Sequence, residues 1–181
     1  MSHANNSGKL VNQVGAVSLA IADRIRDSTE AAARHSSAGP AALVCLNEFL
    51  HEAGLSDLHK VLDLTPSGAV RLVDRLEADG LLERRPAADG RAVRLTLTAR
   101  GKAAARSILA ERQATLERVL EHLTPEEQEL LGHLSAKLLA GLARDRATAR
   151  QLCRLCDTEA CGHHTGSCPV TNAVNERARE S

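Results

Sequence analysis

One stretch, Thr65–Gly101, constrains the fold most, because its hydrophobic period changes once within it. The first half carries apolar residues at helical spacing, which predicts an amphipathic helix. These residues are Val70, Leu72, Val73 and Leu76. Thr65 suits the N-cap of this helix, Pro66 suits its first position and Gly80 suits its end.

Beyond Gly80 the period shortens to two, which predicts a β-hairpin. Residues 87–90, Ala-Ala-Asp-Gly, form a turn sequence, and residues 91–97 then alternate between apolar and polar. One side carries Val93, Leu95 and Leu97, and the other carries Arg94, Thr96 and Thr98. A helix followed by such a hairpin is the arrangement of a winged helix-turn-helix.

Upstream, residues 55–63, LSDLHKVLD, supply the short first helix that a helix-turn-helix needs. Ser56 is expected to cap it. The side chains expected to face inward are Leu58, Val61 and Leu62. Residues 64–66 then form the turn before the second helix, which would read the DNA.

These motifs resemble those of the multiple-antibiotic-resistance regulator (MarR) family. The family's reading helix typically carries Ser-x-x-x-Arg-x-Val-Asp-Arg-Leu. Its wing carries an Asp, an Arg one or two places on, and a strand that ends in Leu-Thr before a Gly. The matching residues here are Ser67, Arg71, Val73, Asp74, Arg75, Leu76, Asp89, Arg91, Leu97, Thr98 and Gly101. The wing tip is shorter than in many family members.

The resemblance implies a mainly α fold, a winged helix-turn-helix with long N- and C-terminal dimerisation helices and a short β-hairpin wing. It also implies a homodimer that binds a pseudo-palindromic operator in double-stranded DNA, with two reading helices in successive major grooves. Family members commonly repress transcription and release DNA when a small molecule enters a cleft beside the dimerisation helices. A small-molecule effector is therefore possible, and nothing in the sequence identifies it.

The reading helix presents four candidate DNA-binding residues. Thr65 and Ser67 stand at its N-terminus, where hydroxyls and backbone N–H groups would bond phosphate or base edges. Arg71 would read guanine through its O6 and N7 atoms. Arg75, four residues on, would pair with phosphate or with an acidic neighbour such as Asp89.

The wing supplies three more candidates: Asp89, Arg91 and Arg94. Arg91 at the tip would enter the narrow, strongly negative minor groove. By resemblance, Asp89 would orient that arginine. The whole chain has a formal net charge of zero, so the case for DNA rests on local charge. The clustered arginines are Arg71, Arg75, Arg84, Arg85, Arg91 and Arg94.

The flanking segments are helical by the same periodicity. Leu10–Arg34 carries an apolar stripe of Val14, Val17, Ile21 and Ile25, and Pro40–Ala53 forms the next helix. Thr98 and Thr124 would cap two later helices, the second of which could run to Arg150 or beyond. The expected organisation is a mobile N-terminus at 1–9, a dimerisation helix at 10–39, the DNA-binding lobe at 40–101, dimerisation helices at 102–150 and a cysteine-rich tail at 151–181.

The tail contains four cysteines in the pattern C-x2-C-x4-C-x6-C: Cys153, Cys156, Cys161 and Cys168. Four thiolates can hold an iron–sulfur cluster or one Zn²⁺ ion. The short gaps and the proline after the last cysteine slightly favour a cluster over zinc. A pair of reversible disulfides is a third reading. His163 or His164 could replace a cysteine, although solvated loop histidines are the simpler interpretation. Cys45, the fifth cysteine, is interpreted as a small buried residue.

Composition limits the alternatives. With one Phe and no Trp or Tyr, stacking of single-stranded bases on aromatic side chains is disfavoured. No apolar run reaches the roughly 20 residues that cross a bilayer, and we expect a cytoplasmic protein without a membrane partner. The competing readings are a metal-dependent or thiol-based enzyme and a helical protein-interaction module. The enzyme is disfavoured because no Gly-rich phosphate loop, nucleophile elbow or two-histidine zinc helix occurs.

Overall fold

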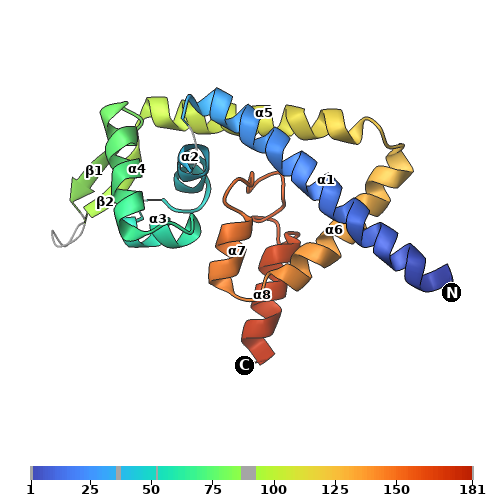
Figure 1. Ribbon diagram of the computed structural model, residues 1–181. Coiled ribbons are helices and arrows are strands. Elements are labelled where there is room, and N and C mark those ends of the chain that lie inside the picture. The colour runs from blue at the N-terminus through green and yellow to red at the C-terminus, as the bar shows by residue number, and fades with distance from the viewer. Residues whose placement is uncertain (1, 36–37, 52, 87–92, 181) are drawn as a thin grey trace.

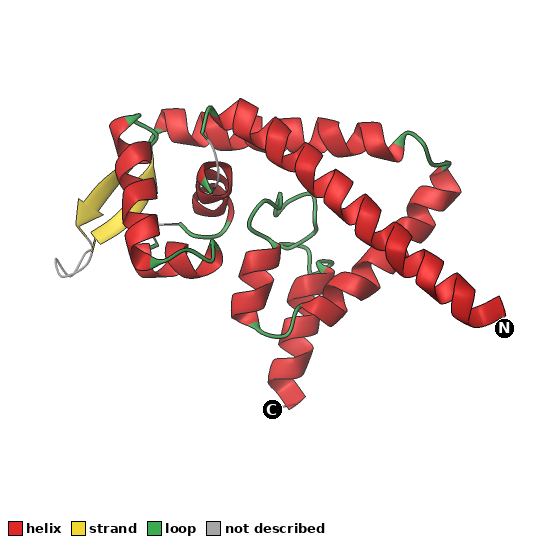
Figure 2. Cartoon of the chain, in the orientation of Figure 1, coloured by secondary structure: helices red, strands yellow, loops and turns green. Residues whose placement is uncertain are grey.

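The computed structural model describes residues 2–35, 38–51, 53–86 and 93–180. Within them the chain forms eight helices and one two-stranded antiparallel sheet (Figure 2). The elements are α1 (Ser2–Ala33), α2 (Gly39–Glu48), α3 (Leu55–Val61), α4 (Pro66–Ala78), β1 (Leu82–Pro86), β2 (Val93–Leu97), α5 (Ala99–Leu120), α6 (Pro125–Leu142), α7 (Arg146–Leu152) and α8 (Pro169–Glu180). The prediction of a mainly α fold with a short β-hairpin is confirmed.

The elements divide into two groups (Figure 1). The winged lobe consists of α2, α3, α4 and the hairpin, and the helical frame consists of the other helices. Helices α2, α3 and α4 and the hairpin gather at the start of α5, while α1 crosses α5 and packs against it. Helix α6 turns away at the far end of α5 and packs against α8. The main core lies in the winged lobe. Its largest fully buried side chains are Leu43, Leu58, Leu76, Leu82, Leu95 and Ile108.

Helix α4 begins and ends as its sequence predicts. The Thr65 hydroxyl accepts a hydrogen bond from the Gly68 amide at 3.1 Å, and Pro66 is the first helical residue. Gly80 adopts a φ of +67° directly after the helix end, a conformation that L side chains rarely adopt. The amide of Gly80 donates to the carbonyl of Glu77 at 2.9 Å, which closes the last turn.

The apolar face of α4 differs from the prediction at one residue. Leu72, Val73 and Leu76 are buried as expected, but Val70 is 39% exposed. Ala69 is fully buried in its place, because residues 69, 72, 73 and 76 follow the i, i+3, i+4, i+7 spacing of one helix face. Val70 therefore belongs to the solvent-exposed surface of α4.

Helix α3 begins at Leu55, the first residue of the predicted range, and ends at Val61, two residues before its predicted end. Gly54 occupies the N-cap, and its amide donates to Oδ2 of Asp57 at 3.3 Å. The prediction that Ser56 caps the helix is wrong, because Asp57 supplies the capping carboxylate from inside the first turn. Leu58 and Val61 are buried against the core as predicted.

The hairpin pairs β1 with β2 in an antiparallel register that sets Leu82 opposite Leu97. Leu95 and Leu97 are buried, whereas Val93 is 53% exposed, so the predicted alternation holds only toward the base of the hairpin. The amide of Leu95 donates to the carbonyl of Ala53 at 2.9 Å and so ties β2 to the segment before α3. The predicted turn at 87–90, with residues 91 and 92, lies outside the described residues.

The first turn of α5 packs directly on the end of the α4–β1 connection. Thr98 caps α5 by accepting from the Gly101 amide at 3.0 Å, and its own amide donates to the Leu81 carbonyl at 3.1 Å. A Cβ atom at Gly101 would lie 1.9 Å from that carbonyl oxygen. Glycine is therefore required at this position by backbone proximity, which explains the Gly of the wing motif.

Several helix boundaries differ from the prediction. Helix α1 begins at Ser2 rather than Leu10, since no proline interrupts residues 2–9. Helix α2 ends at Glu48 rather than Ala53, where the amides of Phe49 and Leu50 both donate to the Cys45 carbonyl. The structure also contains α8, a helix that the sequence had not predicted.

Two separate helices, α6 and α7, stand where the sequence predicted one long helix, because a second N-cap follows α6. Thr124 caps α6 as predicted, and its amide donates to the Glu127 carboxylate at 2.9 Å. The helix stops at Leu142 and does not reach Arg150. The Asp145 carboxylate then accepts from the Thr148 amide at 2.7 Å and starts α7. An aspartate that bonds forward in this way favours a new N-terminus over helix continuation.

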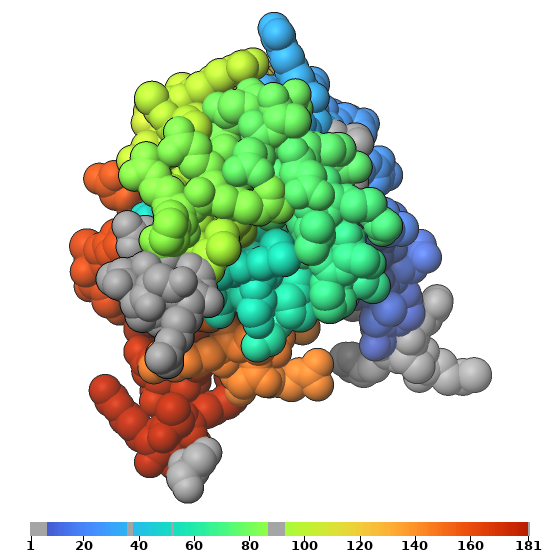
Figure 3. All heavy atoms as spheres, turned by 90° about the vertical axis from the view of Figure 1, so that its left-hand side faces the viewer, coloured from blue at the N-terminus to red at the C-terminus, as the bar shows by residue number. Residues whose placement is uncertain are grey.

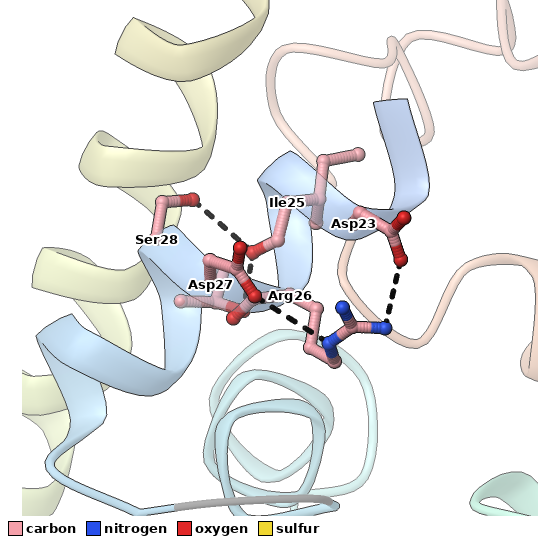
Figure 4. A network of polar contacts seen from close by, with 6 residues as sticks. Asp23, Ile25, Arg26, Asp27 and Ser28 are labelled. Carbon is pink, nitrogen blue, oxygen red and sulfur yellow. Dashed lines mark hydrogen bonds and ion pairs between the residues drawn. The ribbon is translucent and has the colours of Figure 1, made fainter. Parts of the chain in front are cut away.

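Local pairs stabilise the exposed side of α1 (Figure 4). The Arg26 guanidinium bonds Asp23 at 2.9 Å and approaches Asp27 at 3.5 Å. The Ser28 hydroxyl donates to the Ile25 carbonyl at 3.1 Å. These contacts are surface ion pairs and a hydroxyl-to-carbonyl bond within one helix, and they contribute to α1 rather than to a functional site.

Candidate nucleic-acid interface and cysteine cavity

The solvent face of α4 presents the predicted reading residues. Ser67, Arg71 and Arg75 are exposed there, on the opposite side from the buried Leu72 and Leu76. Figure 3 shows this side of the molecule, with α4 in green beside the hairpin. The buried face fixes the helix in the core, so the exposed arginines project from a rigid element.

Neither Arg71 nor Arg75 makes a hydrogen bond or ion pair with a described residue. Arg75 lines a hollow of about 330 Å³ beside Arg34 and His35 of the α1 end. The pairing of Arg75 with Asp89 stays a prediction, because Asp89 lies outside the described residues. Both guanidinium groups can therefore serve an external partner.

The two hydroxyls at the start of α4 differ in their roles. The Thr65 oxygen is used by the cap, and it lies 3.3 Å from the Ser67 hydroxyl. Both residues are exposed, and the first helical amides beside them form a site that favours an anion. Ser67 is thus the freer hydroxyl of the pair for phosphate contact.

Arg84 in β1 joins the hairpin to α4. Its guanidinium bonds the Asp74 carboxylate at 2.6 Å and also pairs with Glu77, and its amide donates to Glu77 Oε1 at 3.1 Å. The hydrogen bond to Asp74 raises the pKa of Arg84, and Glu77 adds to this effect. Sequence reasoning counted Arg84 only as local positive charge. The pairing depends on how β1 packs against α4, so no local sequence pattern indicates it.

The remaining arginines of the hairpin are placed in part. Arg85 bonds Glu83 of its own strand at 2.9 Å. Arg94 is exposed on β2, opposite Arg85 in the register. Asp89 and Arg91 of the predicted wing tip lie outside the described residues. The structure therefore brings Arg94 to the surface, where it lines a hollow with Asp57 of α3 and Arg150 of α7, and leaves the tip contacts as predictions.

The four tail cysteines line one cavity of about 350 Å³. Cys153 directly follows α7, and the Cys156 amide donates back to its carbonyl at 2.9 Å. Cys168 precedes α8, and Cys161 lies in the loop between. The residues that complete this cavity are Phe49, Arg146, Ala149, Arg150, Thr158, His163, Val170, Thr171, Val174 and Asn175. Spacing alone thus predicted a cluster of thiols that the fold brings together.

Two glycines return the chain to this cavity. Gly162 and Gly166 have φ values of +71° and +74°, in the region that favours glycine. A Cβ atom at Gly162 would lie 2.8 Å from Cβ of Ser167, so the turn also needs its small size. These two turns bring Cys161 and Cys168 to the same cavity.

The thiols interact in two pairs. A hydrogen bond with Cys153 lowers the pKa of the Cys156 thiol to about 7, against burial, and the Arg112 and Arg154 guanidinium groups lower it further. The same bond and burial raise the pKa of Cys153. The second pair is Cys161 and Cys168, in which each thiol affects the pKa of the other.

In the second pair as well, the pKa of one thiol is raised and the pKa of the other is lowered. Burial raises the pKa of Cys161 to about 11. Burial also acts to raise the pKa of Cys168, but hydrogen bonds with Thr171 and the bond to Cys161 hold it below its ordinary value. All five cysteines are unbridged thiols. Among the residues that the structure describes, no three His, Cys, Asp or Glu side chains converge closely enough to hold one metal ion.

The other predicted residues of the tail are also placed. His163 and His164 are both exposed, and the His163 ring accepts or donates a hydrogen bond with the Thr171 hydroxyl at 3.0 Å. Cys45 is fully buried, and its thiol donates to the Arg154 carbonyl at 3.2 Å. Burial raises the pKa of Cys45 to about 12. The interpretation of Cys45 as a small buried residue is confirmed.

Comparison with known proteins gives a consistent picture. A sequence model described as the MarR family matches residues 49–92. The HTH-type transcriptional repressor MdtR of Bacillus subtilis (strain 168) is 32% identical over 109 residues, which cover 59% of this chain and 70% of MdtR. The uncharacterized HTH-type transcriptional regulator YwhA of the same strain is 34% identical over 85 residues, which cover 46% of this chain and 61% of YwhA.

Solved structures agree with the sequence relatives. The YusO protein of Bacillus subtilis superposes with a TM-score of 0.65 and 26% identity, over 76% of this chain and 97% of YusO. About a quarter of this chain thus lies outside that match. The named relatives are a transcriptional regulator and a repressor, which favours regulation over catalysis. In the described parts of the chain, no helix combines the length and the apolar character that crossing a bilayer requires.

Proposed function

The chain belongs to the MarR family of transcriptional regulators, and from this we propose that it is a homodimeric repressor that binds a pseudo-palindromic operator in double-stranded DNA. The observation that carries the proposal is the exposed arginine pair on α4, Arg71 and Arg75, which forms no hydrogen bond or ion pair with any residue that the structure describes. A helix held by its buried face and charged on its solvent face is the form that enters a major groove.

The proposed contacts on the helix follow from the chemistry of each group. Arg71 bonds O6 and N7 of a guanine, since its planar fork matches both acceptors. Arg75, Thr65 and Ser67 bond the phosphate backbone, which positions α4 without specifying sequence. Arg84 holds the hairpin against α4 through Asp74.

The wing contacts rest on the family resemblance. Arg91 enters the minor groove beside the major groove that α4 occupies, and Asp89 orients it. Arg94, which is exposed on β2, bonds the phosphates between the two grooves. A fixed angle between helix and wing allows both contacts at once, and the bonds of Arg84 to α4 support such an angle.

A second copy of this chain is the proposed occupant of two apolar faces that nothing in the described chain covers. Helix α6 has no buried residue, and the first half of α1 projects past the frame (Figure 1). Their exposed apolar side chains are Leu10, Val11, Val14, Val17, Leu130, Leu131, Leu134, Leu138, Leu139 and Leu142. Exposed apolar side chains gathered on two helices in this way indicate an interface. A two-fold dimer would bury both faces and duplicate α4 for a palindromic site.

The sign of regulation and a small-molecule input are further parts of the proposal. Repression is proposed from the similarity to MdtR, a repressor. A hollow of about 430 Å³ lies among α1, α2, α5 and the segment after α7, with Arg26, Arg112, Arg154 and Glu30 on its wall. Three guanidinium groups against one carboxylate, on an otherwise largely apolar wall, suit a small organic anion as the effector.

The proposal is tested with Arg71→Ala and the matched control Arg144→Ala. Arg144 is an exposed arginine between α6 and α7, outside α4 and the hairpin. Binding to labelled fragments of the protein's own promoter is measured by fluorescence anisotropy. Loss of a bidentate guanine contact costs about 1–3 kcal/mol for each half-site and relaxes specificity. We expect this loss in Arg71→Ala and wild-type affinity in Arg144→Ala. Equal affinity of the two variants would overturn the assignment of α4.

A further inference from the structure

The cysteine cavity has no role in the DNA-binding proposal, yet several separate features of the fold shape it. Four thiols far from α4 face one space, and two left-handed glycines bring the chain back to it. Phe49, Val170 and Val174 supply apolar walls. Arg146 and Arg150 stand at the same cavity, where positive charge offsets that of thiolates.

We propose that Cys153, Cys156, Cys161 and Cys168 ligate an iron–sulfur cluster that fixes the C-terminal segment between the winged lobe and α6. Each thiol that binds iron releases its proton to solvent. The four cysteines supply the Cys₄ ligand set that such clusters use.

The arrangement of the thiols favours a cluster over a single zinc ion. A structural zinc draws four sulfurs to about 2.3 Å from one point. The four thiols line a cavity of about 350 Å³, which is much larger than the space that one such ion occupies. An inorganic core of several iron and sulfide atoms suits four thiols around such a space better than a single ion does.

The cavity is attached to the DNA-binding lobe by bonds over long sequence separations. Oε2 of Glu48, at the end of α2, accepts from the Thr158 amide at 3.0 Å and from its hydroxyl at 2.7 Å. The Cys45 thiol of α2 donates to the Arg154 carbonyl, and Gln151 donates to the Lys60 carbonyl of α3 at 3.1 Å. Residues between the cysteines are therefore bonded to α2, and the end of α7 is bonded to α3, which packs against α4.

The same segment is attached to the proposed dimer frame. Cys168 and Val174 form a small core with Ala143 at the end of α6. Arg177 of α8 donates to the Ala140 carbonyl at 3.1 Å and also bonds the Ala143 carbonyl. A cluster that orders the loop thus links α2 and α3 to α6. This second step rests on the proposed function, and it makes operator affinity depend on cluster occupancy.

The first experiment tests the cluster alone, on the full chain purified without air and reconstituted with ferrous iron and sulfide. We expect visible thiolate-to-iron absorption and iron and sulfide in equal amounts, about two or about four of each per chain. Cys161→Ser should lose both signals while keeping its helical circular dichroism. Cys45→Ala removes the one cysteine outside the cavity and should keep both signals. One zinc per chain without sulfide, no absorption after reconstitution, or an unchanged Cys161→Ser would each overturn the proposal.

The second experiment measures operator affinity with and without the cluster. We expect a change of about 5-fold or more, the usual range of coupling between two sites. Glu48→Ala keeps all four ligands but removes the bonds to Thr158, so it should retain iron and sulfide while the change shrinks. Equal affinity of cluster-loaded and cluster-free wild type would overturn the coupling. Protein that holds the cluster and binds no promoter DNA in either form would instead overturn the proposed function and leave the cluster standing.

Discussion

Gly101→Ala tests the packing that sets α5 against the winged lobe. The new Cβ would lie 1.9 Å from the Leu81 carbonyl oxygen, so backbone must move by about 1.5 Å to reach the 3.4 Å of ordinary contact. Overpacking of this kind costs about 1–3 kcal/mol, and the Thr98 amide bond to the Leu81 carbonyl, worth about 1 kcal/mol, is strained as well. Alanine regains about 0.5–1 kcal/mol as a better helix former. The net loss should be about 2–3 kcal/mol.

The assay is thermal unfolding followed by circular dichroism. For a chain of this size the loss corresponds to a decrease in Tm of about 4–12 °C. Gly132→Ala in α6 is the matched control, because its added methyl group meets nothing within 4 Å. This control should unfold slightly above the wild type. A Gly101→Ala protein as stable as Gly132→Ala would refute the close approach of α5 to Leu81.

Three further predictions concern the interface, the hairpin and a helix cap. Leu138 is 64% exposed in one chain. Leu138→Glu should therefore weaken the proposed dimer by about 2–4 kcal/mol over its two copies, on the order of 30- to 700-fold in Kd. The neighbouring Lys137→Glu is the control, and sedimentation in which both variants stay equally dimeric would contradict the prediction. Arg84→Ala and Asp74→Ala should couple by about 0.5–1 kcal/mol in a double-mutant cycle of unfolding free energies, and strict additivity would count against the tie between hairpin and α4. Bonds from the Thr148 amide and hydroxyl lower the pKa of Asp145, so its contribution to stability is present above the unfolded pKa near 4 and is lost as pH falls through the lower folded value. The stability difference between wild type and Asp145→Ala should therefore shrink on acidification, and a difference that grows below pH 4 would show that the carboxylate does not cap α7.

Features set by neighbouring residues could be predicted from the sequence. Thr65, Pro66 and Gly80 define the ends of α4 because capping depends on a few adjacent positions. Leu95 and Leu97 likewise reveal the buried side of β2. The period-two pattern becomes unreliable toward Val93, where the hairpin leaves the core.

Features set by distant contacts could not be predicted. Arg84 is charged like its neighbours, and only the fold shows that Asp74 and Glu77 bind it. Glu48 and Thr158 are 110 residues apart, and no local pattern relates them. The cysteine spacing indicated a thiol site, but its attachment to α2 depended on the same kind of long-range contact.

Hydroxyl-radical footprinting of an operator fragment, selected from the promoter by binding, tests most directly whether paired α4 helices read duplex DNA. A dimer with one α4 in each of two successive major grooves predicts two protected segments on one face of the duplex, centred about 10–10.5 base pairs apart. Arg71→Ala should weaken both segments together. A single protected segment, or protection without helical phasing, would contradict the paired arrangement.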